Sequence, residues 1–323
     1  MKIRIKVKVS TLLILSFIYA KNPIITEIFT ADPAPLVYND TVYLYTSHDT
    51  ASVDADNYEM PDWYIFSSTD MVNWKNHGAC LSPQNFSWAD KHAYAGECIY
   101  RDGKFYWYVP TGHKKDENSD GGFGIGVAVS DNPTGPFKDA LGEALIVNEM
   151  TTDMEYGWDD IDPAAFIDDD GQAYLYWGNG SCKWVKLKDN MIELDGPIHT
   201  FTPKNFVEGP WVYKRNELYY MVYASKGTKN ERIEYCTAKS PEGPWNYQGL
   251  IADSNPNCFT IHPGIIDYKG QSYFFYHDGS LPTGGSYRRS ICVDSLHYNP
   301  DGTIEKVTKT REGVQPVQPA AQN

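Results

Sequence analysis

The stretch Gly157-Trp-Asp-Asp-Ile-Asp-Pro-Ala-Ala-Phe-Ile-Asp-Asp-Asp-Gly171 decides the fold, together with the segment Gln-Ala-Tyr-Leu-Tyr-Trp-Gly-Asn that follows it. Ala164 to Ile167 is short and apolar, and Ala173 to Trp177 is aromatic and rich in strand-forming residues. Asp170-Gly171 between them is a dipeptide that two-residue hairpin turns prefer. The stretch therefore predicts two antiparallel strands joined by a tight turn, with Asp162 where the first strand begins.

The same hairpin pattern occurs five times along the chain. Turns at residues 40, 103, 171, 216 and 270 each precede an aromatic strand: Val-Tyr-Leu-Tyr, Phe-Tyr-Trp-Tyr, Ala-Tyr-Leu-Tyr, Leu-Tyr-Tyr-Met and Ser-Tyr-Phe-Phe. Several copies continue with a further strand and a second turn, as in Val127-Ala-Val-Ser-Asp before Asn-Pro-Thr-Gly-Pro-Phe137. Five copies of four strands are typical of a β-propeller. We therefore predict an all-β, five-bladed β-propeller in a single domain, with a two-sheet sandwich as the alternative.

Length and composition agree with one domain of this kind. The 323 residues include 24 Tyr, 9 Trp, 26 Gly and 20 Pro, and no stretch shows sustained helical periodicity. Residues 22–309 are predicted to form the propeller. Residues 310–323 are predicted to form a polar, loose tail rich in Pro and Gln.

Residues 1–20 have the pattern of a secretory signal peptide. Four basic residues within the first eight positions precede an apolar core from Leu12 to Tyr19, and Ala20 is a suitable cleavage edge. The alternative is an alternating strand over residues 2–9. We expect a secreted or periplasmic monomer that has no membrane span after cleavage.

The charge balance and the cysteines narrow the class of partner. Removal of the signal leaves 24 of the 28 basic residues against 42 acidic ones, a net charge of about −18. This balance argues against nucleic acid and anionic membranes and favours a neutral substrate. The six cysteines contain no Cys-x-x-Cys pair, so a zinc site is not expected, and export would permit disulfides without defining their pairing.

The starts of the first strands predict where a site would lie. In a propeller these strands line the central channel, so their first residues converge. Counting back eight residues from the turns at 40, 103, 216 and 270 gives Asp32, Ala95, Glu208 and His262, and nine from the longer turn at 171 gives Asp162. Each of the four ionisable residues is followed directly by Pro or Gly. We therefore expect their side chains to gather at one end of the channel.

Three carboxyl groups in one aromatic-lined pocket suit glycoside hydrolysis. One carboxylate can activate a water, while another, held protonated, gives its proton to the leaving oxygen. The third can raise the pKa of this acid by like-charge repulsion. Trp158, Trp211, Trp88 and Tyr94 are candidates for stacking on sugar rings, and core packing between blades is the alternative for each.

Three segments, in this order, resemble glycoside hydrolase family 43: Ala31-Asp-Pro-Ala-Pro, Ile161-Asp-Pro-Ala-Ala-Phe-Ile-Asp-Asp-Asp-Gly and Val207-Glu-Gly-Pro-Trp. The resemblance covers the chain after the signal segment. It implies a five-bladed, inverting enzyme that acts on α-L-arabinofuranosyl or β-D-xylosyl linkages of plant cell walls. It also implies that Asp32 is the general base, Glu208 the general acid and Asp162 the residue that tunes and orients the acid.

The expected substrate also comes from the resemblance. Trp158-Asp-Asp-Ile-Asp-Pro together with Tyr174-Leu-Tyr-Trp-Gly-Asn is similar to the arabinoxylan-debranching members. An α-L-arabinofuranosidase acting on arabinoxylan or its oligosaccharides is therefore expected, with β-D-xylosidase activity as the alternative. The second blade departs from the family, since it has Tyr94-Ala-Gly-Glu-Cys where many members have Trp-Ala-Pro-Asp. We also expect no added sugar-binding module, so that affinity would come from the propeller face.

Two further site residues are implied by the resemblance. Members place an Arg of the last blade against the sugar and the acid, and Arg289 is the candidate here. Arg288 is the alternative, because neighbours on a strand point to opposite faces. Members also hold a hydrated Ca²⁺ on the axis through a His, for which His262 is the candidate. A hydrogen-bonded, neutral imidazole is the alternative for His262.

Two other classes of protein share parts of this pattern. A propeller that only binds sugar would use the aromatic residues but has no need of three carboxyl groups at strand starts. A retaining propeller hydrolase acting on fructans or sucrose would need its two reacting carboxyl groups closer together than an inverting enzyme does. The resemblance favours the inverting hydrolase over both.

Overall fold

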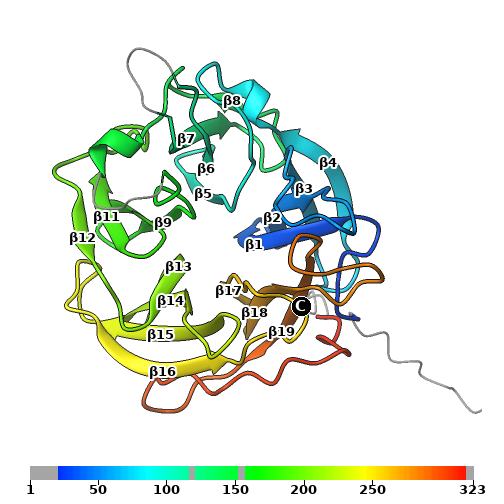
Figure 1. Cartoon of the computed structure of the whole chain (residues 1–323). Helices are drawn as coiled ribbons and strands as arrows, with labels where there is room; N and C mark the ends of the chain where they lie inside the picture. Colours follow the sequence, from blue (N-terminus) through cyan, green and yellow to red (C-terminus); the bar gives the residue numbers. More distant parts are fainter. Residues whose placement is uncertain (1–20, 116–120, 152–156, 318–323) are drawn as a thin grey trace, which may run out of the picture.

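The computed structural model describes residues 21–115, 121–151 and 157–317 and confirms the all-β, five-bladed propeller (Figure 1). The signal peptide predicted for residues 1–20 lies outside the described residues. Helical structure in the described ranges is confined to two short 3₁₀ turns, η1 (Pro83–Asn85) and η2 (Asn148–Met150). None of the described segments forms a helix long and apolar enough to cross a membrane.

Each blade is one antiparallel sheet whose strands run in chain order from the channel outward (Figure 1). The first blade contains β1 (Phe29–Tyr38), β2 (Thr41–Asp49), β3 (Trp63–Ser68) and β4 (Lys75–Leu81). The second contains β5 (Glu97–Arg101), β6 (Lys104–Gly112), β7 (Phe123–Ser130) and β8 (Lys138–Asp139). The third contains β9 (Ala164–Ile167), β10 (Ala173–Trp177), β11 (Cys182–Leu187) and β12 (His199–Phe201).

The last two blades complete the ring. The fourth contains β13 (Phe206–Arg215), β14 (Leu218–Ser225), β15 (Arg232–Ala238) and β16 (Asn246–Ala252). The fifth has three named strands, β17 (Gly264–Tyr268), β18 (Gln271–Asp278) and β19 (Ser290–Leu296). The predicted turns at 40, 103, 171, 216 and 270 all join the first and second strands of a blade, which is why the repeat predicted the blades.

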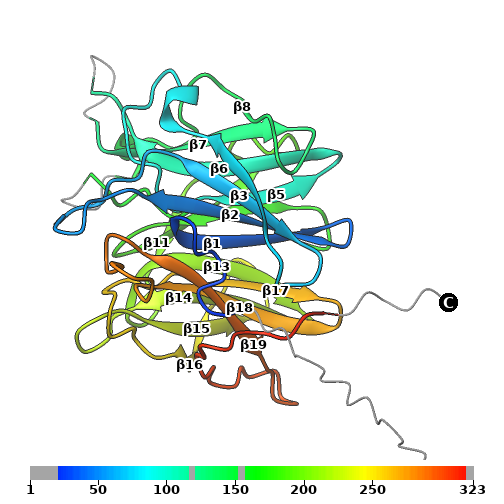
Figure 2. The same ribbon diagram turned by 90° about the vertical axis from the view of Figure 1, so that its right-hand side faces the viewer.

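Residues 22–24 close the fifth blade. The N–H of Ile24 donates to the carbonyl of Ile291 (2.8 Å), and the Asn22 side chain bonds the backbone of Val293 in both directions (2.8 and 3.0 Å). The N–H of Asn22 also donates to the carbonyl of Arg311 (3.0 Å). Figure 2 shows the dark blue start and the red end of the described chain beside β18 and β19. The segment before β1 therefore occupies the edge that a fourth strand would cover.

The expectation of a loose tail does not hold for residues 310–317. Val314 and Val317 are buried in the apolar cluster that also contains Ile25 and Tyr273. The Thr310 hydroxyl donates to Asp294 at 2.6 Å. These two valines anchor the segment because their burial removes apolar surface from water.

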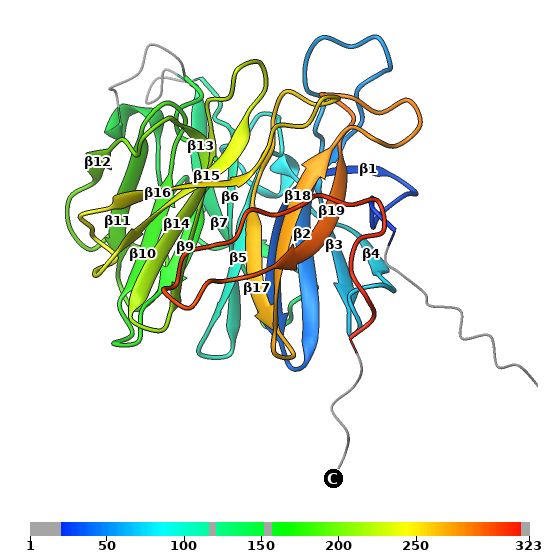
Figure 3. The same cartoon turned by 90° about the horizontal axis from the view of Figure 1, so that it is seen from below.

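Aromatic side chains fill the spaces between blades. Trp107 of the second blade lies edge-on against Tyr45 and Trp63 of the first, with ring centroids 4.9 and 6.2 Å apart. All six cysteines lie in the described residues, and none forms a disulfide. Longer loops, including residues 50–62 and 279–289, gather on one side of the propeller, whereas the hairpin turns of the first strands lie on the other (Figure 3). The loop side is where the first strands begin.

Candidate active site

A pocket of about 260 Å³ lies at the end of the channel where the first strands begin. Its lining includes the five acidic and basic residues predicted for the site: Asp32, Asp162, Glu208, His262 and Arg289. They come from the first, third, fourth and fifth blades, so segments far apart in the sequence converge as expected. The backbone at these strand starts explains how the side chains reach the axis.

A β-bulge of the same size interrupts the first strand in two blades. In β1, Ala31 pairs with Ser47 and Ala34 with Tyr45. An advance of three residues along β1 therefore corresponds to an advance of two residues along β2, which leaves one extra residue in β1. In β13, Glu208 pairs with Ala224 and Trp211 with Val222 in the same manner. Bulges bend the strand and redirect side chains near active sites.

The third blade repeats the bulge just before β9. The N–H of Gly178 donates to the carbonyl of Ile161 (2.9 Å), while Ala164 pairs with Tyr176. Asp162 lies within this irregular step. The three bulges therefore fall at the Asp-Pro and Gly-Pro pairs that the sequence repeats.

Each of the three bulges contains one residue whose backbone has the left-handed conformation. The φ angles are 55° at Asp32, 59° at Asp162 and 61° at Gly209. A Cβ on Gly209 would lie 2.9 Å from Nδ1 of His262, so glycine is required there by both conformation and space. Gly209 is therefore the residue of the fourth blade that is equivalent to Asp32 and Asp162. Counting back from the turn predicted Glu208 at this position, which is wrong by one residue. The count began at the second loop residue in the first blade but at the first loop residue in the fourth.

Asp32 is held as a carboxylate by two basic side chains. Arg289 donates from Nη1 to its Oδ1 at 3.0 Å, and Nδ1 of His277 lies 3.3 Å from the same oxygen. Burial opposes ionisation of Asp32, but Arg289 and His277 outweigh it and hold its pKa well below the usual range. Burial would lower the pKa of His277, yet its hydrogen bonds to Asp32 and Cys258 raise it to about 9.

Arg289, rather than Arg288, faces the pocket. Its Nε and Nη2 donate to the two oxygens of Asp49 at 2.9 Å each, and its guanidinium lies 4.6 Å from the centre of the Tyr58 ring. Arg288 instead bonds the backbone of Thr283 and Ala51. Asp49 thus fixes Arg289 in the plane from which it reaches Asp32.

Glu208 and Asp162 have the opposite electrostatic environment. Burial and the charge of Asp32 raise the pKa of Glu208, although Arg289 and the amide of Asn179 offset part of this effect. Asn179 donates from Nδ2 to Oε2 of Glu208 at 2.7 Å. Burial and the charges of Glu208 and Asp32 raise the pKa of Asp162 well above its usual value. Asp162 accepts the N–H of Gly209 at 3.0 Å, so it is bonded to the peptide that directly follows Glu208.

His262 lines the pocket beside Asp162. Its Nδ1 lies 3.9 Å from Oδ2 of Asp162, and burial lowers its pKa to about 4, so the imidazole is neutral near pH 7. The described residues contain no group of three His, Cys, Asp or Glu side chains arranged to hold a metal ion. Any cation at His262 would therefore take most of its ligands from water, as Ca²⁺ can.

The predicted aromatic residues divide into two groups. Trp158 and Tyr94 line the pocket, and Trp158 is 52 % exposed at its rim. Trp211 and Trp88 do not line it: both are buried in the core, where Trp211 donates to the carbonyl of Ile265 (3.1 Å). Their assignment as substrate-binding residues is wrong because they fill the spaces between blades.

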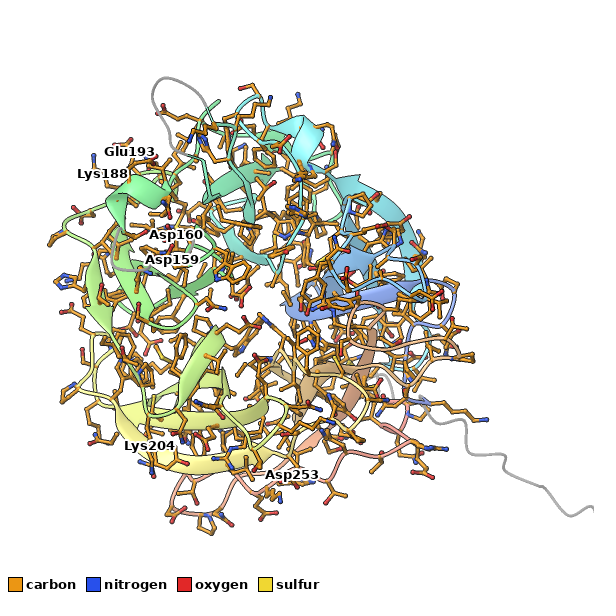
Figure 4. All side chains as sticks on the ribbon, viewed as in Figure 1. Asp159, Asp160, Lys188, Glu193, Lys204 and Asp253 are labelled. Atoms are coloured by element: carbon orange, nitrogen blue, oxygen red, sulfur yellow. The ribbon has the colours of Figure 1, made fainter. Side chains whose placement is uncertain are left out.

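The loop that carries Trp158 rests on a buried polar cluster. Lys183 donates to Asp159 at 3.0 Å, and both side chains are buried. Asp160 accepts hydrogen bonds from Trp177 (2.7 Å) and from Thr151. Figure 4 shows Asp159 and Asp160 nearer the channel than Lys188 and Glu193, which lie at the outer edge of the third blade. The two aspartates thus fix the segment that leads into Asp162.

Sequence reasoning missed four residues of the site. His277 bonds Asp32, Asn179 bonds Glu208, and Tyr58 and Glu231 line the pocket. Asn179 was within the quoted stretch, but as a residue just after an aromatic strand it carried no obvious signal. His277 lies at the end of β18 and Glu231 in the loop after β14.

The chain resembles known enzymes over most of its length. The sequence profile of glycosyl hydrolases family 43 matches residues 20–304. A xylosidase/arabinosidase of Bacteroides ovatus is 32 % identical over 324 residues, which cover 85 % of this chain and 94 % of the relative.

Two solved structures show the same agreement. A β-xylosidase/α-arabinofuranosidase from a compost microbial metagenome, in complex with xylotriose and in a calcium-free form, has a TM-score of 0.78. It is 31 % identical, with 89 % of this chain and 97 % of that chain covered. An α-L-arabinofuranosidase of Clostridium thermocellum has a TM-score of 0.72 at 33 % identity, with 89 % and 96 % covered.

A five-bladed propeller whose channel mouth gathers three carboxyl groups in unlike environments defines a glycoside hydrolase. The profile match and the relatives make the assignment specific. This chain belongs to glycosyl hydrolases family 43, which confirms the family predicted from the three motifs.

Proposed function

We propose that this chain is an inverting α-L-arabinofuranosidase that removes arabinofuranosyl side chains from arabinoxylan. The observation that carries the proposal is the opposite shift of two carboxyl pKa values in one pocket: the pKa of Asp32 is lowered and the pKa of Glu208 is raised. Pairs of titratable groups driven apart in this way divide into a base and an acid.

In the proposed reaction each carboxyl group has one task. Asp32 accepts a proton from a water whose oxygen bonds to the anomeric carbon, while the glycosidic C–O bond breaks and Glu208 gives its proton to the leaving oxygen. Arg289 and His277 keep Asp32 ionised. Asp162 accepts the N–H of Gly209 and so orients the peptide after Glu208, while burial and the charge of Asp32 raise the pKa of the acid.

The choice of arabinofuranosyl side chains has two supports. The motif from Trp158 through Asn179 is similar to that of debranching members, and Asn179 bonds Glu208 directly. The exposed ring of Trp158 at the rim offers a stacking surface for a polysaccharide backbone, while a single side-chain sugar enters the pocket. β-D-Xylosidase activity is the second candidate, because both activities appear in the names of the Bacteroides ovatus and compost relatives.

Paired nitrophenyl α-L-arabinofuranoside and β-D-xyloside substrates test this choice. We expect kcat/KM to be at least about tenfold higher on the arabinofuranoside, a difference of about 1.4 kcal/mol in transition-state binding. Arabinoxylan should then release arabinose without shortening of its backbone. Faster hydrolysis of the xyloside, with xylose as the product from xylo-oligosaccharides, would establish the second candidate instead.

We also propose a hydrated Ca²⁺ next to His262. The neutral imidazole of His262, which lines the pocket, would supply one ligand, and water would supply the others. The cation would damp the repulsion among the carboxyl groups. Secretion through residues 1–20 is proposed from the sequence, and the amino-terminal sequence of the exported protein tests it.

A further inference from the structure

Glu231 is a fourth carboxyl group of the pocket that the proposed reaction does not use. It lies in the loop between β14 and β15 and lines the pocket together with Glu208 and Asp162. Its contacts within the protein are few. Its hydrogen bonds have a structural role, whereas its charge has no explanation within the protein.

The hydrogen bonds of Glu231 connect two loops. The N–H of Glu231 donates to the carbonyl of Phe259 (2.9 Å), and its Oε2 accepts the N–H of Ile261 (3.2 Å). These bonds attach the β14–β15 loop to the segment that carries His262 into the pocket. The other oxygen, Oε1, makes no hydrogen bond to any residue of the described ranges, and it is not one of the fully buried atoms that lack a partner. Glu231 itself lines the pocket.

The negative charge that Glu231 can carry is not explained by these hydrogen bonds. The Glu231 carboxyl lies close enough to Glu208 and Asp162 to interact with both, and burial together with Glu208 raises its pKa well above the usual value. A glutamine could accept the N–H of Ile261 without this repulsion. A pocket-lining carboxyl group kept beside two others, with one oxygen that no described residue bonds, is expected where a ligand supplies the missing partner.

We propose that Glu231 hydrogen-bonds a hydroxyl group of the pentose bound in the pocket and is a specificity-determining residue. This inference rests on the proposed function. The anomeric carbon must lie between Asp32 and Glu208, so the ring hydroxyls face the remaining polar groups of the lining. A site that bonds a hydroxyl rejects an analogue without it, because its own polar group is then left unpaired.

The test compares Glu231→Ala and Glu231→Gln with wild type on nitrophenyl pentosides and on their monodeoxy analogues. Loss of a hydrogen bond to a carboxyl group should lower kcat/KM about 10- to 100-fold in Glu231→Ala. Glu231→Gln, which retains an acceptor, should lose less than about fivefold. On the one analogue that lacks the contacted hydroxyl, wild type and Glu231→Ala should become equal, because removal of either partner abolishes the same bond.

A matched control separates recognition from loop anchoring. Asp139 also accepts backbone N–H groups, from Leu141 and Gly142 at 3.1 Å, but lies outside the pocket lining. Asp139→Ala should lower the melting temperature without changing kcat/KM. If Glu231→Ala loses the same factor on every deoxy analogue, Glu231 acts only through packing and the inference is overturned.

Binding without turnover separates this inference from the proposed function. Free L-arabinose, D-xylose and their deoxy analogues can be titrated calorimetrically into wild type and Glu231→Ala. Equal affinities in the two proteins would overturn the role of Glu231 whatever the enzyme hydrolyses. Wild type that hydrolyses neither nitrophenyl pentoside would reject the proposed function, while a weaker affinity of Glu231→Ala would still support the contact.

Discussion

The two ends of the central channel are built from the same five first strands, yet their chemistry differs. The end where the strands begin holds the pocket with Asp32, Asp162 and Glu208. The end where they finish holds a cavity of about 390 Å³, lined largely by apolar side chains such as Leu36, Val37, Ile99, Phe166, Val212 and Ile266. The difference therefore arises within each strand and not between blades.

Strand regularity accounts for the difference. Near the turns the pairing is regular, as between Leu36 and Tyr43, so apolar side chains alternate into the channel. At the starts, bulges and left-handed residues redirect acidic side chains to the axis. Buried carboxyl groups also need partners. Arg289, His277 and Asn179 supply these partners at the mouth, whereas Glu97, which lines the apolar cavity from the first residue of β5, accepts one N–H, from Ala165 at 3.1 Å.

The largest effect is expected from Asp32→Asn at the mouth. The water loses its base whatever the leaving group, so kcat should fall by at least about 10³-fold on both aryl and natural substrates. Steady-state kinetics on both kinds of substrate measure this, with circular dichroism to show that the fold is retained. Activity within tenfold of wild type on either substrate would exclude Asp32 as the base.

Arg289→Lys should have the next largest effect. The single nitrogen of a lysine cannot reproduce the two bonds to Asp49 together with the bond to Asp32, so kcat/KM should fall about 10- to 100-fold. Weaker pairing also raises the pKa of Asp32. Because the base must be ionised, the acidic limb of the pH profile should move to higher pH. Arg288→Lys is the matched control and should leave the profile unchanged.

Removal of Ca²⁺ by chelation is expected to change activity less than either substitution. If a hydrated Ca²⁺ lies beside His262, exhaustive EDTA treatment should lower activity or melting temperature, and Ca²⁺ should restore it better than Zn²⁺. His262→Ala should remove the response to Ca²⁺. Full activity of EDTA-treated protein, with no metal found by elemental analysis, would leave His262 as a hydrogen-bonding residue of the channel.

The smallest effect on catalysis is expected from a change at Glu97, which lines the apolar cavity. Glu97→Gln should leave kcat/KM within about twofold of wild type, because Glu97 lies outside the pocket lining. Burial raises the pKa of Glu97 well above its usual value, so the wild type loses stability as pH rises through that pKa. The variant should therefore melt higher at neutral pH, with the gain disappearing below about pH 4. A large loss of activity would mean that the two ends are coupled.

The sequence predicted the fold because each blade begins with a local signal. A turn dipeptide and an aromatic strand are sufficient to place a hairpin, and five of them define the ring. Counting back from those turns also placed Asp32, Asp162 and His262 at the mouth. It assigned Glu208 to the mouth as well, although one residue out of register, because loop boundaries cannot be counted from composition.

The missed residues have a physical explanation. His277, Asn179 and Glu231 lie at or after the ends of second strands, and an antiparallel hairpin places those ends beside the starts of the first strands. Counting forward seven or eight residues from the turns at 270 and 171 reaches His277 and Asn179, but Glu231 lies fifteen residues after the turn at 216, directly before β15, so the same count does not find it. Trp88 and Trp211 were assigned wrongly because an indole fills an inter-blade space as readily as it covers a sugar, and only packing distinguishes the two.

The role of Glu208 as the proton donor to the leaving group is tested most directly by the leaving-group dependence of Glu208→Gln. Turnover of arabinoxylan oligosaccharides should fall about 10²- to 10⁴-fold, because their leaving oxygen needs protonation. On a dinitrophenyl glycoside, whose leaving group is strongly acidic, the fall should be less than about tenfold. An equal fall on both substrates would contradict the assignment of Glu208 as the acid.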